Sequence, residues 1–169
     1  MFYQNLQPEI FATQMNGNTR LDVMKMVWAA HAETPDALSW PIGGNGKTSF
    51  KLDRLAPANG FAHANAHDAL ADVEATIFMF RKIQLGAPSL FAKLLRTREK
   101  TLILTELKSY LPMEITLRFG GNPPRTYQGC YCGTSKSNSN TIGFADFDLN
   151  DAAELAGASE LEVTDLIIG

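Results

Sequence analysis

The chain contains 169 residues, a length that suits one ordinary domain or two small ones. Hydrophobic residues make up 45% of it, which allows a packed core and argues against a disordered chain. The net charge of −3 does not mark a nucleic-acid-binding protein, so any basic contact must be local. No signal peptide opens the chain, and no apolar run approaches the ~18 residues of a membrane span. We therefore expect a cytoplasmic protein without membrane contact.

The first part of the chain, as far as about residue 110, carries helical patterns. Apolar spacing predicts helices over residues 20–31, 50–58, 68–84, 89–98 and 100–110. A loop rich in glycine and proline separates the first two, and Asn59-Gly60 ends the second. In the first helix the shared apolar face consists of Leu21, Met24, Val27 and Trp28. In the longest helix, 68–84, the stripe that we expect to be buried consists of Leu70, Val73, Ile77 and Phe80.

Beyond Leu111-Pro112 the pattern changes to the alternation that is typical of β-strands. Strands are predicted over residues 113–119, 127–132 and 142–148. Capping-box spacings at 151–154 and 159–162 favour a further helix near the end. The predicted fold class is α+β, with a helical part over residues 1–110 and a small β-rich part over 111–169.

The two cysteines, Cys130 and Cys132, lie two residues apart on a predicted strand. Side chains at this spacing share one face of a strand, and their geometry is poor for a mutual disulfide. A zinc site would need further cysteine or histidine ligands nearby, and the surrounding sequence offers none. We predict two reduced thiols.

The glycine-rich segment 43–48, with the sequence GGNGKT, ends as a phosphate-binding P-loop ends. That motif also requires a glycine five positions before Gly46, where this chain has Pro41. It requires a buried strand in front as well, and the preceding residues do not have that pattern. We interpret the segment as a glycine-rich turn.

Two further pairs have the spacing of metal ligands. His63 and His67 have the i, i+4 spacing of helical zinc pairs, but no third ligand is evident. Asp146 and Asp148 face the same way on a predicted strand, as carboxylates on the exposed face of a small barrel often do. We take His63 as a loop residue and the two aspartates as surface residues.

The most informative motif places His67 five residues before Asp72, at the opening of the 68–84 helix. A helix advances about 100° per residue, so two residues five apart within one helix point well away from each other. The pair converges only if His67 lies in the loop and Asp72 in the first helical turns, and Asp68 as N-cap places the boundary there. Such a pair suits metal-assisted phosphodiester hydrolysis, in which the carboxylate holds a divalent cation and the imidazole takes a proton from the attacking water. On spacing alone, a capped helix with an incidental histidine is the simpler interpretation.

The residues around this pair carry a family resemblance. AHDALADVEATI resembles the third motif of the proofreading-type Asp-Glu-Asp-Asp exonucleases, in the variant with a histidine base. Over longer stretches, SFKLDRLAPANGFAHANAHDALADVEATI and PSLFAKLLRTREKTL resemble the bacterial exodeoxyribonuclease I family, and so do LDVM at 21–24 and Trp40-Pro41. Members of this family degrade single-stranded DNA from its 3′ end. The resemblance covers residues 2–110 well and residues 113–165 more weakly.

The resemblance implies that Asp72 is the last of four acidic metal ligands and that His67 is the general base. Two Mg²⁺ ions, or Mn²⁺ in their place, would lie on either side of the scissile phosphate. Residues 1–110 would be the helical C-terminal half of a ribonuclease-H-like exonuclease domain, and 111–169 part of a small barrel like a Src-homology domain. The other three carboxylates of the family, including an Asp-x-Glu on a strand, have no counterpart here. We therefore expect an internal fragment that is inactive by itself.

A local group of basic residues suits contact with the phosphates of single-stranded DNA. Arg96, Arg98 and Lys100 lie close together, and Lys93 is on the same predicted helix as the two arginines. From charge alone, a solvated helical face explains these residues equally well.

An alternative hypothesis is a non-catalytic binding module, or one subunit of a split exonuclease. In the family, the junction between exonuclease domain and barrel also docks the acidic tail of single-stranded-DNA-binding protein. By approximate alignment, Thr34 and Lys93 stand where the best-known relatives use an arginine and a tyrosine for this contact. That difference argues against tail binding by this chain.

Overall fold

A computed structural model describes residues 19–62, 69–98, 100–138, 141–148 and 159. The chain divides into two compact units, which are described separately. The first comprises residues up to Ile103 together with Thr116–Arg125, and the second comprises Leu104–Ile115 and the residues from Thr126 onward. The two capping-box segments, 151–154 and 159–162, lie outside the described residues except for Ser159, so the further helix near the end stays a prediction.

Helix α1, Val23–Glu33, is shorter at its start than the sequence predicts. Asp22 acts as N-cap, because its side chain accepts a hydrogen bond of 3.0 Å from the backbone N–H of Met24. A cap residue has non-helical backbone angles, so the helix cannot begin earlier. The expected apolar face of α1 is also displaced, since Met24 is 37% exposed. The buried residues are Met26, Val27, Ala29 and Ala30, with Leu21 and Trp28 partly buried beside them.

A 3₁₀ turn, η2 (Pro35–Ala37), and helix α2 (Leu52–Ala58) lie on either side of the glycine-rich segment. Asn59 ends α2 and holds the loop in place, because its side-chain amide donates to the carbonyls of Ser39 and Leu55 and accepts from the Ser39 N–H. Gly60 follows with a φ of 96°, a left-handed conformation that glycine adopts without steric cost. The predicted end of this helix is confirmed.

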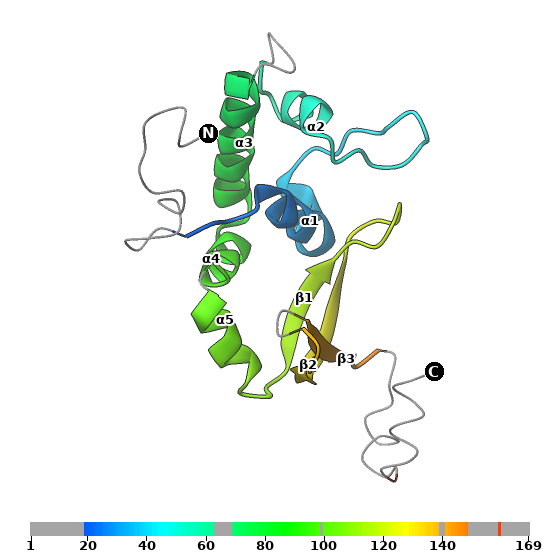
Figure 1. The fold of residues 1–169 in the computed structure, drawn as a ribbon. Coiled ribbons are helices and arrows are strands. Elements are labelled where there is room, and N and C mark those ends of the chain that lie inside the picture. The colour runs from blue at the N-terminus through cyan, green and yellow to red at the C-terminus, as the bar shows by residue number, and fades with distance from the viewer. Residues whose placement is uncertain (1–18, 63–68, 99, 139–140, 149–158, 160–169) are drawn as a thin grey trace. The chain divides into compact units, whose positions relative to one another are not determined.

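Helix α3, Ala69–Gly86, packs against α1, α2 and α4 (Pro88–Arg96) in the helical unit (Figure 1). The face that it buries carries Ala75, Met79 and Ile83, four residues apart. The expected buried stripe is wrong at three of its four positions, because Leu70, Val73 and Ile77 are 64%, 54% and 45% exposed. Phe80 is partly buried, and its ring makes an edge contact with Phe91 of α4 at 4.9 Å between centroids.

The core of the first unit is a cluster of apolar side chains from the four helices and the connecting loop. Met26, Leu55, Met79 and Ile83 are the largest of its fully buried members. His31 lies at its edge, in edge-on contact with the rings of Trp40 and Phe50 at 4.7 and 5.1 Å. No helix of the described residues is both long and apolar enough to span a membrane.

Helix α5, Lys100–Leu107, ends before the predicted residue 110. Tyr110 has a φ of 56°, and a non-glycine residue in this left-handed region cannot continue a right-handed helix. Strands β1 (Met113–Leu117), β2 (Arg125–Thr134) and β3 (Ile142–Asp146) follow, so the three predicted strands are confirmed. The structure is therefore α+β, with helices first and a small sheet after them.

The sheet has the strand order β1-β2-β3. Strands β2 and β3 are antiparallel, with Gly129 opposite Asp146 and Thr134 opposite Ile142. The register shifts between Tyr131 and Gly133, so that Cys132 is an extra residue in a β-bulge. Cys130 and Cys132 are both free thiols, as predicted.

Candidate functional site

The candidate site is at the start of α3. Asp72 lies in the first turn of this helix with its side chain exposed, and the hydroxyl of Thr76 donates to its backbone carbonyl at 2.8 Å. The predicted position of Asp72 is thus confirmed. His67, its proposed partner, and Asp68, the proposed N-cap, lie outside the described residues. The convergence of His67 with Asp72 stays a prediction.

A cavity of about 590 Å³ lies beside the middle of α3, where Met79 lines it. Its walls come from α1, α2 and α3, and include Val27, Leu55 and Met79. Thr76, one helical turn beyond Asp72, also lines it. Asp72 itself does not line this largely apolar cavity.

Metal ligands are sparse in the described part of the chain. Within it, no group of three or more histidine, cysteine or acidic side chains could hold an ion. The His63–His67 zinc pair lies outside the described residues. Asp146, the last residue of β3, is buried rather than exposed. Asp148 lies just beyond the strand, and its backbone N–H donates a hydrogen bond of 3.1 Å to the side chain of Asp146. The prediction that these two aspartates share one face of a strand is wrong, because they form a turn at the end of the strand.

The basic residues predicted to contact DNA lie around the turn between α4 and α5. Arg96 is the last residue of α4, Arg98 follows in the turn, and both side chains are exposed. Together with Leu95 and Leu102 they line a shallow pocket of about 200 Å³. Lys100 begins α5, and its side chain lies outside the description.

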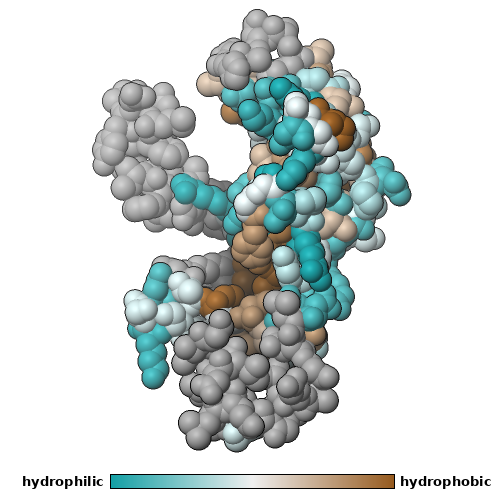
Figure 2. Space-filling view, turned by 90° about the vertical axis from the view of Figure 1, so that its right-hand side faces the viewer, coloured by the Kyte–Doolittle hydropathy of each residue, from teal (hydrophilic) through white to brown (hydrophobic). Residues whose placement is uncertain are grey.

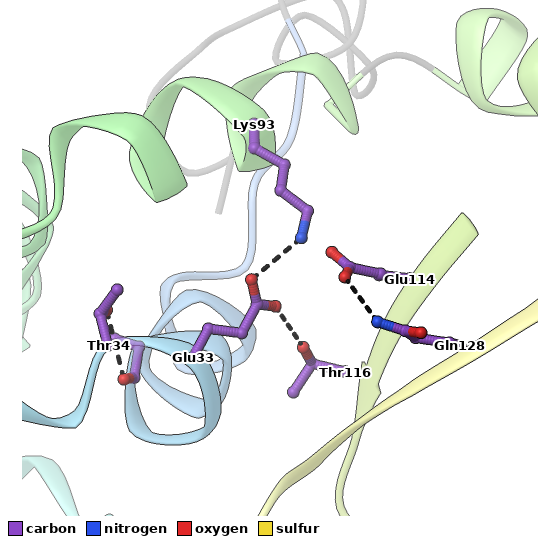
Figure 3. Close-up of polar contacts among 7 residues, drawn as sticks. Glu33, Thr34, Lys93, Glu114, Thr116 and Gln128 are labelled. Atoms are coloured by element: carbon purple, nitrogen blue, oxygen red, sulfur yellow. Dashed lines mark hydrogen bonds and ion pairs between the residues drawn. The ribbon is translucent and has the colours of Figure 1, made fainter. Parts of the chain in front are cut away.

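Lys93 does not join this basic group. Its ammonium lies 2.9 Å from the carboxylate of Glu33, whose other oxygen accepts a hydrogen bond of 3.1 Å from Thr116 (Figure 3). The ion pair links α4 to the end of α1, and the exposed fractions of the two side chains are 42% and 22%. Thr34, the other residue considered for tail docking, turns its hydroxyl to the carbonyl of Ala30 at 3.4 Å. Sequence reasoning missed Glu33, because its partners are 60 and 83 residues away in the chain.

The segment 43–48 is a turn and not a P-loop, as predicted. A β-bridge joins Ile42 to Thr48, and the N–H of Gly43 donates to the carbonyl of Lys47 at 2.7 Å. Gly46 has a φ of 74°, which this tight turn requires. The next helix begins only at Leu52, so the turn does not lead directly into a helix N-terminus.

Comparison with known proteins gives one consistent result. Exodeoxyribonuclease I of Escherichia coli strain K12 is 35% identical over 115 residues, which is 67% of this chain and 24% of the relative. The protein of the same name from Haemophilus influenzae is 39% identical over 99 residues, which is 59% of this chain and 21% of the relative. This chain is related to exodeoxyribonuclease I. No family model matches the sequence.

Solved structures of exodeoxyribonuclease I agree with the sequence comparison. The E. coli enzyme in complex with a dT13 oligonucleotide superposes with a TM-score of 0.71 at 28% identity, over 93% of this chain and 34% of that one. The moderately thermophilic enzyme from Methylocaldum szegediense superposes with a TM-score of 0.70 at 27% identity, over 97% of this chain and 35% of that one. The chain thus spans about a quarter of the curated relatives and about a third of the solved chains.

Proposed function

We propose that this chain is part of a metal-dependent 3′→5′ exonuclease that hydrolyses the phosphodiester bonds of single-stranded DNA. The observation that carries the proposal is the relationship to exodeoxyribonuclease I across the His67–Asp72 motif, together with the exposed position of Asp72 in the first turn of α3. A relative of known structure was solved with a dT13 oligonucleotide, which supports single-stranded DNA as the substrate class.

His67 is the proposed general base. Its imidazole takes a proton from a water molecule, the resulting hydroxide attacks phosphorus, and the bond from phosphorus to the 3′ oxygen breaks. A nucleoside 5′-monophosphate leaves, and the 3′ oxygen of the shortened strand takes up a proton from solvent water to become a hydroxyl. Because the base acts on the transition state and contributes little to substrate binding, removal of His67 should affect turnover more than affinity.

Asp72 is the proposed metal ligand, but it cannot form a Mg²⁺ site by itself. Mg²⁺ keeps its hydration shell against a single carboxylate, and the described residues hold no group of three ligands around it. Two Mg²⁺ or Mn²⁺ ions would supply charge stabilisation at the scissile phosphate once further carboxylates are present. We therefore infer that this polypeptide is inactive alone and that it acts with a segment that contributes those ligands.

The same segment would provide a ribonuclease-H-like sheet. Leu70, Val73 and Ile77 of α3 are apolar and exposed, and the neighbouring cavity is lined largely by apolar side chains. Such surface is what a sheet covers when helices pack on it. The strands β1–β3 would be part of the Src-homology-like barrel, and Arg96, Arg98 and Lys100 would contact DNA phosphates.

The alternative, docking of the acidic tail of single-stranded-DNA-binding protein, receives less support. One solved relative is described as an ExoI/SSB-Ct complex, with a TM-score of 0.68 at 26% identity. In this chain, however, the carboxylate of Glu33 neutralises Lys93 and would repel an acidic tail. Catalysis is therefore the better-supported function.

The test is reconstitution. A segment carrying the three further carboxylates and the sheet is added as a second chain or as a fusion. Mg²⁺-dependent release of nucleotides from 3′-labelled single-stranded DNA is then measured. Activity of the combined protein with none from either part supports the proposal. Clear metal-dependent release by this chain alone would contradict the inference that ligands are missing.

A further inference from the structure

The two cysteines of the chain lie on β2 in the second unit, whereas the candidate catalytic residues belong to the first. The first unit carries no cysteine, and hydrophilic residues cover much of its helical part on the side that Figure 2 shows. A site built from thiolates must therefore lie on β2.

The β-bulge on β2 sets the position of one of the two thiols. Cys132 is the extra residue of the bulge, whereas Cys130 is paired with Ala145 of β3. The thiol of Cys132 folds back along its own strand and donates to the carbonyl of Cys130 at 3.7 Å. A side chain at position 143 would begin 3.5 Å from the Cβ of Cys132, so Gly143 leaves this side of the residue open. Bulges redirect side chains in this way, and here the Cys132 thiol lies over the peptide group of Cys130.

Both thiols can be reached from solvent and influence each other. Cys132 is exposed, Cys130 is half-buried, and neither takes part in a disulfide. Burial raises the pKa of the Cys132 thiol, the neighbouring Cys130 thiol raises it further, and a hydrogen bond from the backbone of Ala145 opposes the rise. The two sulfurs thus share one environment, in which two negative charges are unfavourable unless a cation lies between them.

The spacing of the two cysteines restricts what the pair can hold. A disulfide requires sulfurs about 2.0 Å apart, and side chains two residues apart on a strand meet that condition poorly. An ion between the sulfurs relaxes the condition, because metal–thiolate bonds of about 2.3 Å allow the sulfurs to be as much as about 4.6 Å apart. The pair therefore suits a bridging ion better than a direct sulfur–sulfur bond.

The number and kind of the ligands select the ion. Structural Zn²⁺ sites take four ligands, and within the described part of the chain no group of three or more histidine, cysteine or acidic side chains could hold an ion. Asp146 lies opposite Gly129 and so faces the other side of the sheet from Cys130, because successive side chains alternate. Cu(I) prefers soft thiolates and, as a monovalent ion with a filled d shell, accepts two ligands.

We propose that Cys130 and Cys132 form a binding site for the soft monovalent cation Cu(I), held between their two sulfurs. Each thiol loses its proton to solvent as its sulfur binds, so two S–H bonds are replaced by two S–Cu bonds and two protons are released. Copper stays in the +1 state, and no electron is transferred. The site takes no part in the proposed hydrolysis, which uses hard ions on oxygen ligands.

The test is a competition for Cu(I) between the full chain and the coloured chelator bicinchoninate, without oxygen and with ascorbate present. The chain should remove one Cu(I) per polypeptide from the coloured complex. Cys132→Ser and Cys130→Ser should each weaken binding by more than about 100-fold, because loss of even an outer partner of a metal ligand costs about 10- to 100-fold. Cys132 is exposed, so its variant keeps the test valid if the change at Cys130 impairs folding.

The matched control moves one thiol instead of removing it. Cys132→Ser combined with Thr134→Cys keeps two cysteines per chain but places them four residues apart on β2. This double variant should bind Cu(I) no better than Cys132→Ser alone. Binding equal to that of the parent chain would overturn the proposal, because any two thiols would then suffice.

Further measurements distinguish a chelate within one chain from other sites. X-ray absorption should show two sulfur ligands on Cu(I), Zn²⁺ at equal concentration should not displace it, and light scattering should show no rise in apparent mass. One ion per two chains with a doubled mass would assign the copper to a bridge between copies and overturn the proposal. Displacement by Zn²⁺, parent-like binding by the serine variants, or no uptake of copper by the parent chain would overturn it as well. These measurements involve neither Mg²⁺ nor DNA, so they leave the exonuclease proposal to its own test.

Discussion

The two faces of α3 differ in their surroundings although both are apolar. One face carries Met79 and Ile83, which are completely buried against the neighbouring helices. The other carries Val73 and Ile77, which are 54% and 45% exposed. Removing apolar surface from water stabilises a protein by about 25 cal/mol per Å², and this gain is the same for either face of the helix. The helical unit thus buries only one of the two apolar faces of α3. The other face remains available to pack against a further segment.

Asp72, the candidate metal ligand, lies beside the exposed apolar face of α3. Asp72 is exposed and adjacent in sequence to Val73, at the end of α3 where the second apolar face begins. If a sheet covers that face, it also brings its own side chains to Asp72.

The largest effect is expected in the reconstituted exonuclease, where the uncovered face is proposed to be covered. There, His67→Ala should lower turnover by roughly two to four orders of magnitude, the usual contribution of a general base, while DNA binding survives. Asp72→Asn should weaken metal binding and activity together. Steady-state hydrolysis and anisotropy measure the two effects, with His63→Ala as the matched control. Near-wild-type turnover of His67→Ala would leave His67 as a loop residue.

The covered face should dominate the stability of the isolated chain. Met79→Ala should lower the free energy of unfolding by about 2 to 5 kcal/mol, because it leaves a cavity in the core. Ile77→Ala on the other face should change it by no more than about 0.5 kcal/mol. Urea unfolding monitored by circular dichroism gives both values. Equal costs at the two positions would mean that Ile77 is covered within this chain.

The uncovered face should promote self-association. Replacing Val73 and Ile77 with glutamine keeps good helix formers in α3 and removes apolar surface, so the apparent mass of the isolated chain should fall toward that of a monomer. Light scattering at equal protein concentrations measures the change. Leu111→Gln, at an apolar residue that is 65% exposed outside α3, is the control. A parent chain that is monomeric and melts cooperatively would contradict this prediction.

The smallest effect is expected for the ion pair between Glu33 and Lys93, which links α1 to α4. Both of these helices pack against α3. Glu33→Gln removes the charge but keeps a side chain that can bind Thr116 and Lys93, so the loss should stay below about 1 kcal/mol. The loss should shrink as salt is added, because both charges are partly exposed. Thermal melts at low and high salt measure it, and Glu106→Gln is an exposed control. A larger loss that does not depend on salt would show that Glu33 acts through packing.

Local sequence signals predicted the elements of this fold. Periodicity identified the helices and strands, and Asn59-Gly60 ended α2 where predicted, because cap and turn preferences depend on neighbouring residues. The boundaries moved where a single side chain or backbone angle decided them, as at Asp22 and Tyr110. The same local reasoning placed Asp72 in the first turn of α3.

Tertiary structure decided which apolar face is buried and which charges meet. The spacing of Leu70, Val73 and Ile77 fits a buried stripe as well as that of Ala75, Met79 and Ile83, so periodicity could not choose between them. Arg118 contacts the ring of Phe50, and Glu33 contacts Lys93, across 68 and 60 residues of chain respectively. Contacts of this separation depend on how the elements pack, and no local preference encodes them. The sequence alone thus determined the helices, the strands and the position of Asp72, while packing within the unit determined the buried face of α3 and the contacts of Arg118 and Glu33.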